Sequence, residues 1–320
     1  MKIFRKLDQI PRDFGPAVLT VGNYDGLHLG HRQILKQMVE RAKQLQARSV
    51  VLTFDPHPIR ILRPREAPPL ITPMPYKLRL LEETGLDAVV ILPFTRDLST
   101  MPPFEFAEQI ISTALHAVEV HEGFNFRFGH RAEGDIDRLR EYGTRLGFAV
   151  RAYDALQAQG YIASSSQVRD LIAAGELAPA RHLLGRPFRI YSNPGRGRGY
   201  GHKYTVPTVN LSRYDELVPK HGVYVTQIAL SGECFNAVTN IGNRPTFGPE
   251  SFAIETHILN FHPIELTVET NVELTFLKRL RDEIKFPSVD ALRDQISRDV
   301  HHARRYFELL RIFGRGPASE

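Results

Sequence analysis

The chain has little cysteine, with Cys234 as the single one among 320 residues. One cysteine excludes an internal disulfide framework and a zinc site built from cysteines, and it suits a reducing compartment. Long apolar runs are also lacking, because none approaches the roughly twenty residues that span a bilayer. The segment from Met1 to Phe14 has no apolar core of signal-peptide length. We therefore expect a cytoplasmic protein that does not bind a membrane.

The excess of positive charge is modest. The chain carries 41 Lys and Arg against 36 Asp and Glu, a net charge of +5, and its pI is near 9.3. Because the basic residues are scattered among acids, they do not mark a nucleic-acid-binding face. The surplus suits phosphorylated small molecules, and it is equally typical of ordinary solvated surface charge. We expect small-molecule substrates and no nucleic-acid partner.

Short apolar runs alternate with helical patterns through the first half of the chain. The runs at Ala17 to Val21 and Val50 to Phe54 predict strands on either side of a helix. The alternation continues through Ala88 to Leu92 and Val118 to Val120. Such repetition favours the α/β class, with a doubly wound parallel sheet covered by helices on both faces.

The period changes to strand-like runs beyond Gly185, so we place a domain boundary there and expect domains at residues 1–184 and 185–320. Turn residues separate six such runs: Phe188 to Tyr191, Val206 to Leu211, Val223 to Ile228, Cys234 to Ile241, Ile254 to Leu259 and Leu266 to Leu277. The pattern favours an all-β domain, an antiparallel β-barrel. Behind Ser288, one apolar stripe at helical spacing predicts a terminal helix that packs on the barrel.

The segment from Gly22 to His31, with the sequence Gly-Asn-Tyr-Asp-Gly-Leu-His-Leu-Gly-His, lies between an apolar run and a helical pattern. Glycines let a backbone approach a polyphosphate, and free N–H groups at a helix start supply positive potential. His28 and His31 could neutralise charge on a reacting phosphate. Alone, a His-x-x-His spacing is more often a metal-binding pair or an incidental pair of surface histidines. A metal site would need a third ligand nearby, and Asp25 is the one local candidate, whereas the glycines have a direct use with phosphate. The segment therefore predicts a nucleotide-phosphate site.

This segment resembles the Gly-x-Phe-Asp-Gly-x-His-x-Gly-His signature of the bacterial bifunctional riboflavin kinase and FAD synthetase family, with Tyr24 in place of the usual phenylalanine. The resemblance implies that His28 and His31 are catalytic and stabilise charge on the reacting phosphates. It also implies ATP-binding roles for Gly22, Tyr24, Asp25 and Gly26.

Three further segments of the first half resemble this family. Phe54 to Pro58 is similar to its Phe-Glu-Pro-His-Pro, which implies flavin binding by Pro56, His57 and Pro58. Gly123 to Gly129 is similar to its flavin and nucleotide loop, which implies flavin binding by Asn125. Ala163 to Arg169 is similar to its Ile-Ser-Ser-Thr-x-Ile-Arg, with Ala163 and Ser166 as departures, and implies ATP binding by Ser164, Ser165 and Arg169. Without the resemblance, these residues would be a loop histidine, a turn asparagine and a helix cap.

Glycines interleave with basic residues from Pro194 to Lys203, which alone indicates a flexible loop or an RNA-binding stretch. The run resembles the family's riboflavin kinase signature, in which a glycine-bearing loop covers ATP, and it implies ATP binding by Gly195, Gly201 and His202. The following Pro207-Thr208-Val209-Asn210 resembles the family's Pro-Thr-Ala-Asn turn and implies that Thr208 and Asn210 bind Mg²⁺, which prefers oxygen ligands. Thr205 and Val206 stand where the family usually has Gly-Phe.

Glu255 lies in a strand-like run of apolar and β-branched residues. Because an unpaired carboxylate is expensive to bury, it either faces solvent on the alternating face of the strand or serves a site. The runs from Asn240 to Phe247 and from Ile254 to Leu259 also resemble the riboflavin kinase module. The resemblance implies that Glu255 is the catalytic base that takes the proton from the ribityl 5′-hydroxyl of riboflavin.

The resemblance extends from Ala17 to about Phe307 and implies a nucleotidyltransferase domain followed by a riboflavin kinase-like barrel. The barrel module would phosphorylate riboflavin to FMN with ATP and Mg²⁺, and the first module would adenylylate FMN with ATP to give FAD and pyrophosphate. Two alternatives stay open. One is a related adenylyltransferase for another phosphorylated acceptor, with the barrel as a regulator. The other is a nucleic-acid-binding protein that uses Arg196 to Lys203, where Tyr200 and the adjacent Tyr204 are the aromatic residues available for stacking.

Overall fold

The structure is a computed structural model that describes residues 1–11, 13–195, 208–243, 252–262, 267 and 269–313. The chain divides into two compact units, residues 1–167 and 168–320. Among the described residues, no helix is both long and apolar enough to cross a membrane.

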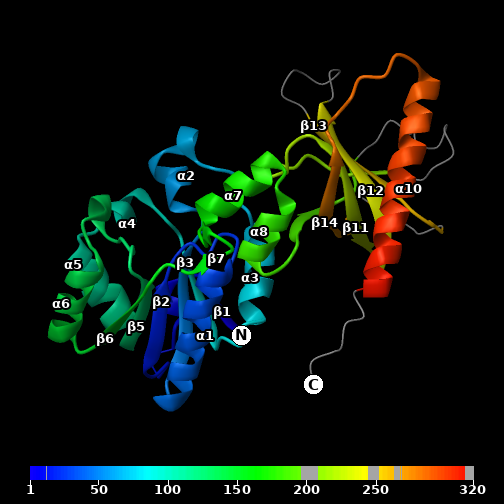
Figure 1. Cartoon of the computed structure of the whole chain (residues 1–320). Helices are drawn as coiled ribbons and strands as arrows, with labels where there is room; N and C mark the ends of the chain where they lie inside the picture. The colour runs from blue at the N-terminus through cyan, green and yellow to red at the C-terminus, as the bar shows by residue number, and fades with distance from the viewer. Residues whose placement is uncertain (12, 196–207, 244–251, 263–266, 268, 314–320) are drawn as a thin grey trace. The chain divides into compact units, whose positions relative to one another are not determined.

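A parallel sheet of six strands forms the centre of the first unit, in the order β1-β4-β3-β2-β5-β6 (Figure 1). The strands are β1 (Lys2–Phe4), β2 (Ala17–Val21), β3 (Arg48–Phe54), β4 (Ala88–Leu92), β5 (Ala117–Gly123) and β6 (Ala149–Tyr153). Every residue of β2 and β4 is buried, which explains why these strands are continuous apolar runs. The predicted parallel sheet is confirmed.

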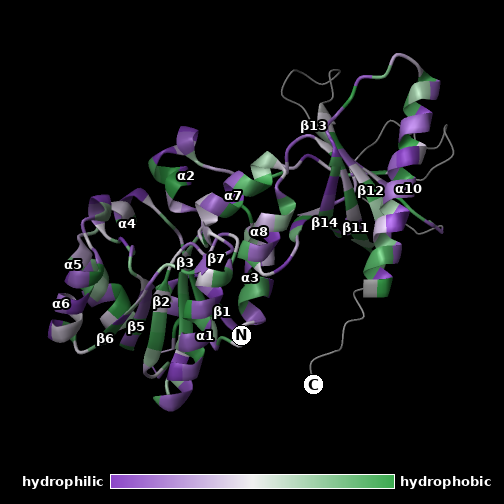
Figure 2. Ribbon diagram, in the orientation of Figure 1, coloured by the Kyte–Doolittle hydropathy of each residue, from purple (hydrophilic) through white to green (hydrophobic). Residues whose placement is uncertain are grey.

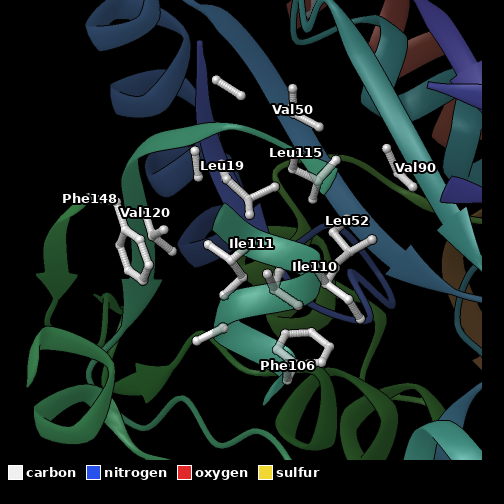
Figure 3. Packing of buried hydrophobic residues seen from close by; sticks show 14 of the residues in the cluster. Leu19, Val50, Leu52, Val90, Phe106, Ile110, Ile111, Leu115, Val120 and Phe148 are labelled. Carbon is white, nitrogen blue, oxygen red and sulfur yellow. The ribbon is translucent and has the colours of Figure 1, made fainter. Parts of the chain in front are cut away.

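Helices and short elements connect these strands. They are η1 (Leu7–Gln9), α1 (Leu29–Gln44), α2 (Pro58–Leu62), η2 (Pro64–Glu66), α3 (Met74–Glu82), α4 (Arg96–Thr100), α5 (Pro103–Glu105), η3 (Phe106–Ala114), η4 (His130–Ala132) and α6 (Ile136–Leu146). After β6, β7 (Gln157–Ala158) and β8 (Tyr161–Ile162) pair with each other. Segment η3 is a π-helix whose apolar side chains cover one face of the sheet. Figure 3 shows this packing, with the following labelled residues in the cluster: Leu19, Val50, Leu52, Val90, Phe106, Ile110, Ile111, Leu115, Val120 and Phe148. Helix α1 covers the other face. Val120 on β5 packs in the cluster with η3, so its neighbour Glu119 points to the opposite face. The Nε of Arg41 on α1 lies 2.9 Å from the carboxylate of Glu119.

The order of the strands reverses between β2 and β5. The chain passes from β2 to β3 and β4 on one side and then returns to β5 on the other side of β2. In the described part of the chain, the pairing of β2 with β5 ends at Leu19, opposite Val120. Open α/β sheets bind ligands in the crevice beyond the carboxyl ends of the strands at such a reversal. This crevice between β2 and β5 is therefore where a ligand is expected.

The second unit contains an antiparallel sheet of six strands in the order β10-β13-β12-β11-β14-β9. The strands are β9 (Phe188–Ser192), β10 (Thr208–Asn210), β11 (Gly222–Leu230), β12 (Glu233–Asn243), β13 (Phe252–Ile258) and β14 (Val272–Arg281). The sheet curls until its edges meet, because Pro194, just after β9, bridges Leu211, just after β10. The predicted antiparallel barrel is confirmed in this curled form. Its last strand was expected from Leu266 but begins at Val272, because Thr267 and Thr270 form a hydrogen-bonded turn before it.

Among the described residues of the second unit, the helices are α8 (Leu177–Leu184), α10 (Val289–Phe313) and the part of α7 (Ser165–Ala174) that begins at Val168. The predicted terminal helix is α10, which carries apolar and polar residues along its length (Figure 2). Its Ala303 is fully buried against Val223, Val225 and Val238 on β11 and β12. These contacts place α10 on one face of the sheet.

Candidate functional site

A cavity of about 770 Å³ opens in the first unit where β2 to β5 end. Five phenylalanines contribute to its apolar lining: Phe54, Phe94, Phe106, Phe126 and Phe128. Asn23, Ser99 and Asn125 add neutral polar groups, while Arg63, Arg127 and Arg131 add positive charge. A cavity of this kind suits a planar aromatic ligand that carries polar and anionic groups.

The glycine-histidine segment connects β2 to the start of α1. Gly26 has φ +83, and a Cβ there would lie 3.0 Å from Ile71 Cδ1, so the position requires glycine. His28 precedes the helix, and its Nδ1 accepts the backbone N–H of His31 at 3.4 Å. The segment therefore forms a tight loop at a helix N-terminus, an arrangement that binds anions.

The side chains of His28 and His31 lie face to face at this helix start. Their ring centroids are 3.7 Å apart with an interplanar angle of 21°, and Tyr24 lies 4.9 Å from His31 on the ring-centroid measure. Burial lowers the pKa of His31 well below its ordinary value, and the nearby charges of His28 and Lys77 lower it further. His31 Nδ1 is buried without a hydrogen-bond partner among the residues that the structure describes. In the described part of the chain, the pair therefore presents a ring nitrogen at the helix start that no protein group satisfies.

Asp25 fixes this loop to the segment before α3. Its carboxylate accepts the backbone N–H groups of Ile71 and Thr72 at 2.9 to 3.1 Å and the hydroxyl of Thr72 at 3.2 Å. Thr72 Oγ1 in turn accepts the N–H of Gly26 at 2.9 Å. The carboxylate is therefore engaged inside the protein, where it holds the loop in place. Ile71 and Thr72 carry no sequence signal for this contact, which spans about 46 residues of chain.

Ser164 and Ser165 lie next to the glycine loop. Ser165 Oγ donates to the backbone oxygen of Asp25 at 2.7 Å, and Ser164 Oγ accepts the N–H of Gln167 at 3.2 Å. A Cβ at Gly30 would lie 3.3 Å from the backbone oxygen of Ala163, so the two segments approach closely. The structure thus brings both serines to the loop. Arg169 lies on α7 in the second unit.

The residues expected to bind flavin separate into two groups. The described residues that line the cavity include Pro58 and Asn125 but not Pro56 or His57. His57 Nδ1 instead accepts the N–H of Ile59 at 3.3 Å and caps α2. Gly22 of the glycine loop also lines the cavity, so the cavity adjoins this loop.

Two residues beside the loop, Lys77 and Glu122, were not predicted from the sequence. Lys77 is 3% exposed, and its Nζ donates to the backbone oxygen of Asn23 at 2.7 Å. The signal was a lysine on the apolar side of a helical pattern, next to Tyr76 and Leu80. Glu122 is also 3% exposed and accepts the N–H of Val21, and its signal was a charged residue at the end of a buried strand.

The second candidate site lies on the face of the antiparallel sheet that carries α10. The register places Asn210 of β10 beside Glu255 of β13, and Glu255 beside Asn240 of β12. Thr208 is opposite His257, two residues along each strand. Because cross-strand partners and residues two apart share a face, Thr208, Asn210 and Glu255 lie on the same face. Asn240 also pairs with Val223, so the two side chains share a face. Val223 packs in the hydrophobic cluster that contains Ala303 of α10, so this is the face on which α10 lies.

Gly195 joins the start of the glycine and arginine run to this face. Its N–H donates to the backbone oxygen of Asn210 at 2.8 Å, and a Cβ would lie 2.7 Å from the backbone oxygen of Leu211. The position therefore accepts glycine alone without a backbone shift. The expected ATP-binding residues Gly201 and His202 lie outside the described residues, as do Thr205 and Val206.

Comparison with known proteins gives a consistent result for both units. The family model of FAD synthetase matches residues 10–167, and that of riboflavin kinase matches residues 184–307. A bifunctional riboflavin kinase/FMN adenylyltransferase of Haemophilus influenzae is 32% identical over 308 residues, which is 96% of this chain and 99% of that protein. One of Pseudomonas fluorescens is 33% identical over 305 residues, covering 95% and 97%.

A solved structure is also similar over nearly the whole chain. It is a Streptococcus pneumoniae protein described as a macrolide-efflux protein, with a TM-score of 0.84 and 26% identity, and the match covers 94% of this chain and 98% of that one. The likeness extends through both units.

Proposed function

The chain belongs to the bifunctional riboflavin kinase/FMN adenylyltransferase family, and on that premise we propose which of its residues carry each reaction. The chain is an enzyme that phosphorylates riboflavin with ATP to form FMN and adenylylates FMN with ATP to form FAD. We assign the FMN adenylyltransferase module to residues 1–184 and the riboflavin kinase module to residues 185–320. The kinase match argues against a barrel that only regulates.

For the adenylyltransferase module, we place the isoalloxazine of FMN in the cavity of the first unit. The phenylalanine rings offer apolar contact, and Pro58 and Asn125 line the same space. The flavin binding assigned to Pro56 and His57 is then indirect, because this turn sets the start of α2. The positive charges of Arg63 and Arg127 suit the FMN phosphate.

The triphosphate of ATP is placed at the start of α1, over Gly22, Gly26 and the two serines of the 164–165 segment. An oxygen of the FMN phosphate attacks the α-phosphorus of ATP, a new P–O bond forms, and pyrophosphate leaves with the electrons of the broken bond. His28 and His31 stabilise the negative charge on the reacting phosphates. Tyr24 and Asp25 support ATP binding by holding the loop, since both are buried. We also propose that Arg169 binds this ATP, as the resemblance of the 163–169 segment implies.

For the riboflavin kinase module, we propose that Glu255 takes the proton of the ribityl 5′-hydroxyl while its oxygen attacks the γ-phosphorus of ATP. ADP leaves, and FMN is formed. Thr208 and Asn210 offer hydroxyl and amide oxygens on the same face, a donor set that fits Mg²⁺. When bound there, Mg²⁺ would neutralise phosphate charge. Gly195, Gly201 and His202 are proposed to contact this ATP.

The register that places Glu255 beside Asn210 is the observation that carries the kinase assignment. It joins a base and two oxygen ligands from segments about 45 residues apart. We further propose that the enzyme works in the cytoplasm on riboflavin, FMN and ATP, without a nucleic-acid or membrane partner.

Product analysis of the purified chain tests the proposal. Riboflavin, ATP and Mg²⁺ should give FMN first and FAD afterwards, each separable by chromatography. Omitting Mg²⁺ should stop FMN formation. An adenylyltransferase for another acceptor would instead leave riboflavin unchanged, and that result would reject the kinase assignment.

A further inference from the structure

Lys77 is a buried cation next to the adenylyltransferase loop. It lies on α3 and is 3% exposed, among the buried side chains of Tyr76, Leu80 and Leu81. A buried ammonium group is expensive unless it is paired and hydrogen-bonded. Burial lowers the pKa of Lys77, whereas the carboxylates of Asp25 and Asp55 favour its charged form. Because burying a lysine here is costly, we expect this side chain to have a function.

The hydrogen bond of Lys77 ends on the peptide between Asn23 and Tyr24. Its Nζ donates to Asn23 O at 2.7 Å. Tyr24 has φ +49, a conformation that non-glycine residues rarely adopt and that the surroundings must maintain. Asn23 lines the cavity, and its Oδ1 is buried without a hydrogen-bond partner in the described part of the chain. Fixing this peptide therefore keeps the amide of Asn23 at the cavity and the Tyr24 ring against His31.

The charge of Lys77 also acts on the histidine pair. Lys77 is one of three influences that lower the pKa of His31, after burial and His28. The other titratable or charged groups in this environment are Tyr24 against the His31 ring, Asp25 and Asp55 facing Lys77, and Glu122 facing Tyr24. The cation thus lies within electrostatic reach of the site where a triphosphate is proposed to bind.

We propose that Lys77 is a positioning residue for adenylyl transfer, which fixes the Asn23–Tyr24 peptide at the cavity and sets a positive charge beside the His28–His31 pair. The inference rests on the proposed function of this pair. Lys77 acts through Asn23 and His31, so its two contributions can be separated. The hydrogen bond orders the loop, and the charge sets the pH at which His31 changes protonation.

Three substitutions separate these contributions. Lys77→Arg keeps a donor and the charge, Lys77→Gln keeps a donor without the charge, and Lys77→Met removes both. Lys36→Met, at an exposed position of α1, is the matched control. For each variant, kcat and KM for FAD formation from FMN and ATP are measured across pH. Circular dichroism of the same samples reports that the whole chain is folded, and their riboflavin kinase activity reports that the second unit is intact.

We expect Lys77→Met to lose about tenfold or more in kcat for FAD formation, because loss of loop geometry misplaces reacting groups. The limb of the pH profile that reports the protonation of His31 is identified by its absence in His31→Ala. This limb should move to higher pH in both Lys77→Gln and Lys77→Met, because removing a neighbouring cation raises the pKa of His31. Lys77→Arg should keep the limb at its wild-type position. Riboflavin kinase activity should be unchanged in all variants.

Two results would overturn the inference. One is a wild-type pH profile and kcat in Lys77→Gln and Lys77→Met. The other is a uniform loss of rate with the limb unmoved, which would reduce Lys77 to a packing role. If Lys77→Met fails to fold, Lys77→Gln still decides the question. Failure of the proposed function gives a different result, since the wild-type chain itself would then form no FAD from FMN and ATP.

Discussion

Replacing Glu122 with leucine should destabilise the crevice between β2 and β5, whereas replacing it with glutamine should not. In a parallel strand, successive N–H groups point to opposite neighbours. The N–H of Gly22 points to β3, where it bonds to Leu52 O at 2.9 Å, so the N–H of Val21 points toward β5. Because the strands have parted there, Glu122 Oε1 accepts that N–H. Thr20 Oγ1 lies 3.5 Å from the same oxygen.

The size of the effect follows from the group left without a partner. Glu122→Leu leaves a buried N–H unsatisfied, which costs about 1 to 3 kcal/mol in the free energy of unfolding of the first unit. Glu122→Gln keeps an acceptor oxygen at the same place. Hydrogen exchange of peptides from β2 and β5, followed by mass spectrometry, should show faster exchange in the leucine variant and near-normal exchange in the glutamine variant.

The contribution of Glu122 to the free energy of unfolding depends on pH with a definite sign. Burial raises the pKa of Glu122 well above its ordinary value of 4.5. The folded chain therefore keeps a proton that the unfolded chain releases above about pH 4.5, so this carboxyl lowers stability as pH rises toward the folded pKa. Glu122→Gln has no such proton to lose. It should gain stability relative to wild type between pH 5 and pH 8. Equal stability of Glu122→Leu and Glu122→Gln at the same pH would refute the argument from the Val21 N–H. A Glu122→Gln variant that gains no stability over the wild type between pH 5 and pH 8 would refute the argument from the pKa of Glu122.

Three further substitutions test other contacts. Thr72→Val removes the hydroxyl that joins the loop to its support, so stability should fall by about 1 kcal/mol and KM for ATP in FAD formation should rise in steady-state assays. Gly195→Ala places a Cβ 2.7 Å from a backbone oxygen and displaces Asn210, so FMN formation should fall about tenfold or more while FAD formation from FMN stays constant. Arg281→Met leaves the buried carboxylate of Asp299 without its cation, which should destabilise the second unit by about 3 kcal/mol in calorimetry. An unchanged Tm of that unit would contradict the last expectation.

Local patterns predicted the sheets because burial leaves a direct mark on the sequence. Strands β2 and β4 are covered on both faces and are therefore continuous apolar runs. The stacking of His28 with His31 is equally local, since residues three apart come together at a helix start. These features depend on neighbours in the sequence, and they could be predicted.

Contacts between distant segments left no such mark. The hydrogen bonds from Thr72 to Asp25 and from Lys77 to Asn23 join residues 47 and 54 positions apart. The register of β10 with β13, which places Asn210 beside Glu255, depends on how the edge strand docks. Sequence motifs named the two residues separately, and the pairing of the strands brings them together.

The central claim is that each reaction depends on residues of its own module, 1–184 for adenylyl transfer and 185–320 for riboflavin phosphorylation. Glu255→Ala and His31→Ala, each supplied with riboflavin, ATP and Mg²⁺, test it when assayed alone and as a mixture. Alone, Glu255→Ala should form neither FMN nor FAD from riboflavin but should convert supplied FMN to FAD, and His31→Ala should accumulate FMN. The mixture should convert riboflavin to FAD, because FMN made by one variant is used by the other. Loss of both activities in either folded variant, or no FAD from the mixture, would contradict the claim.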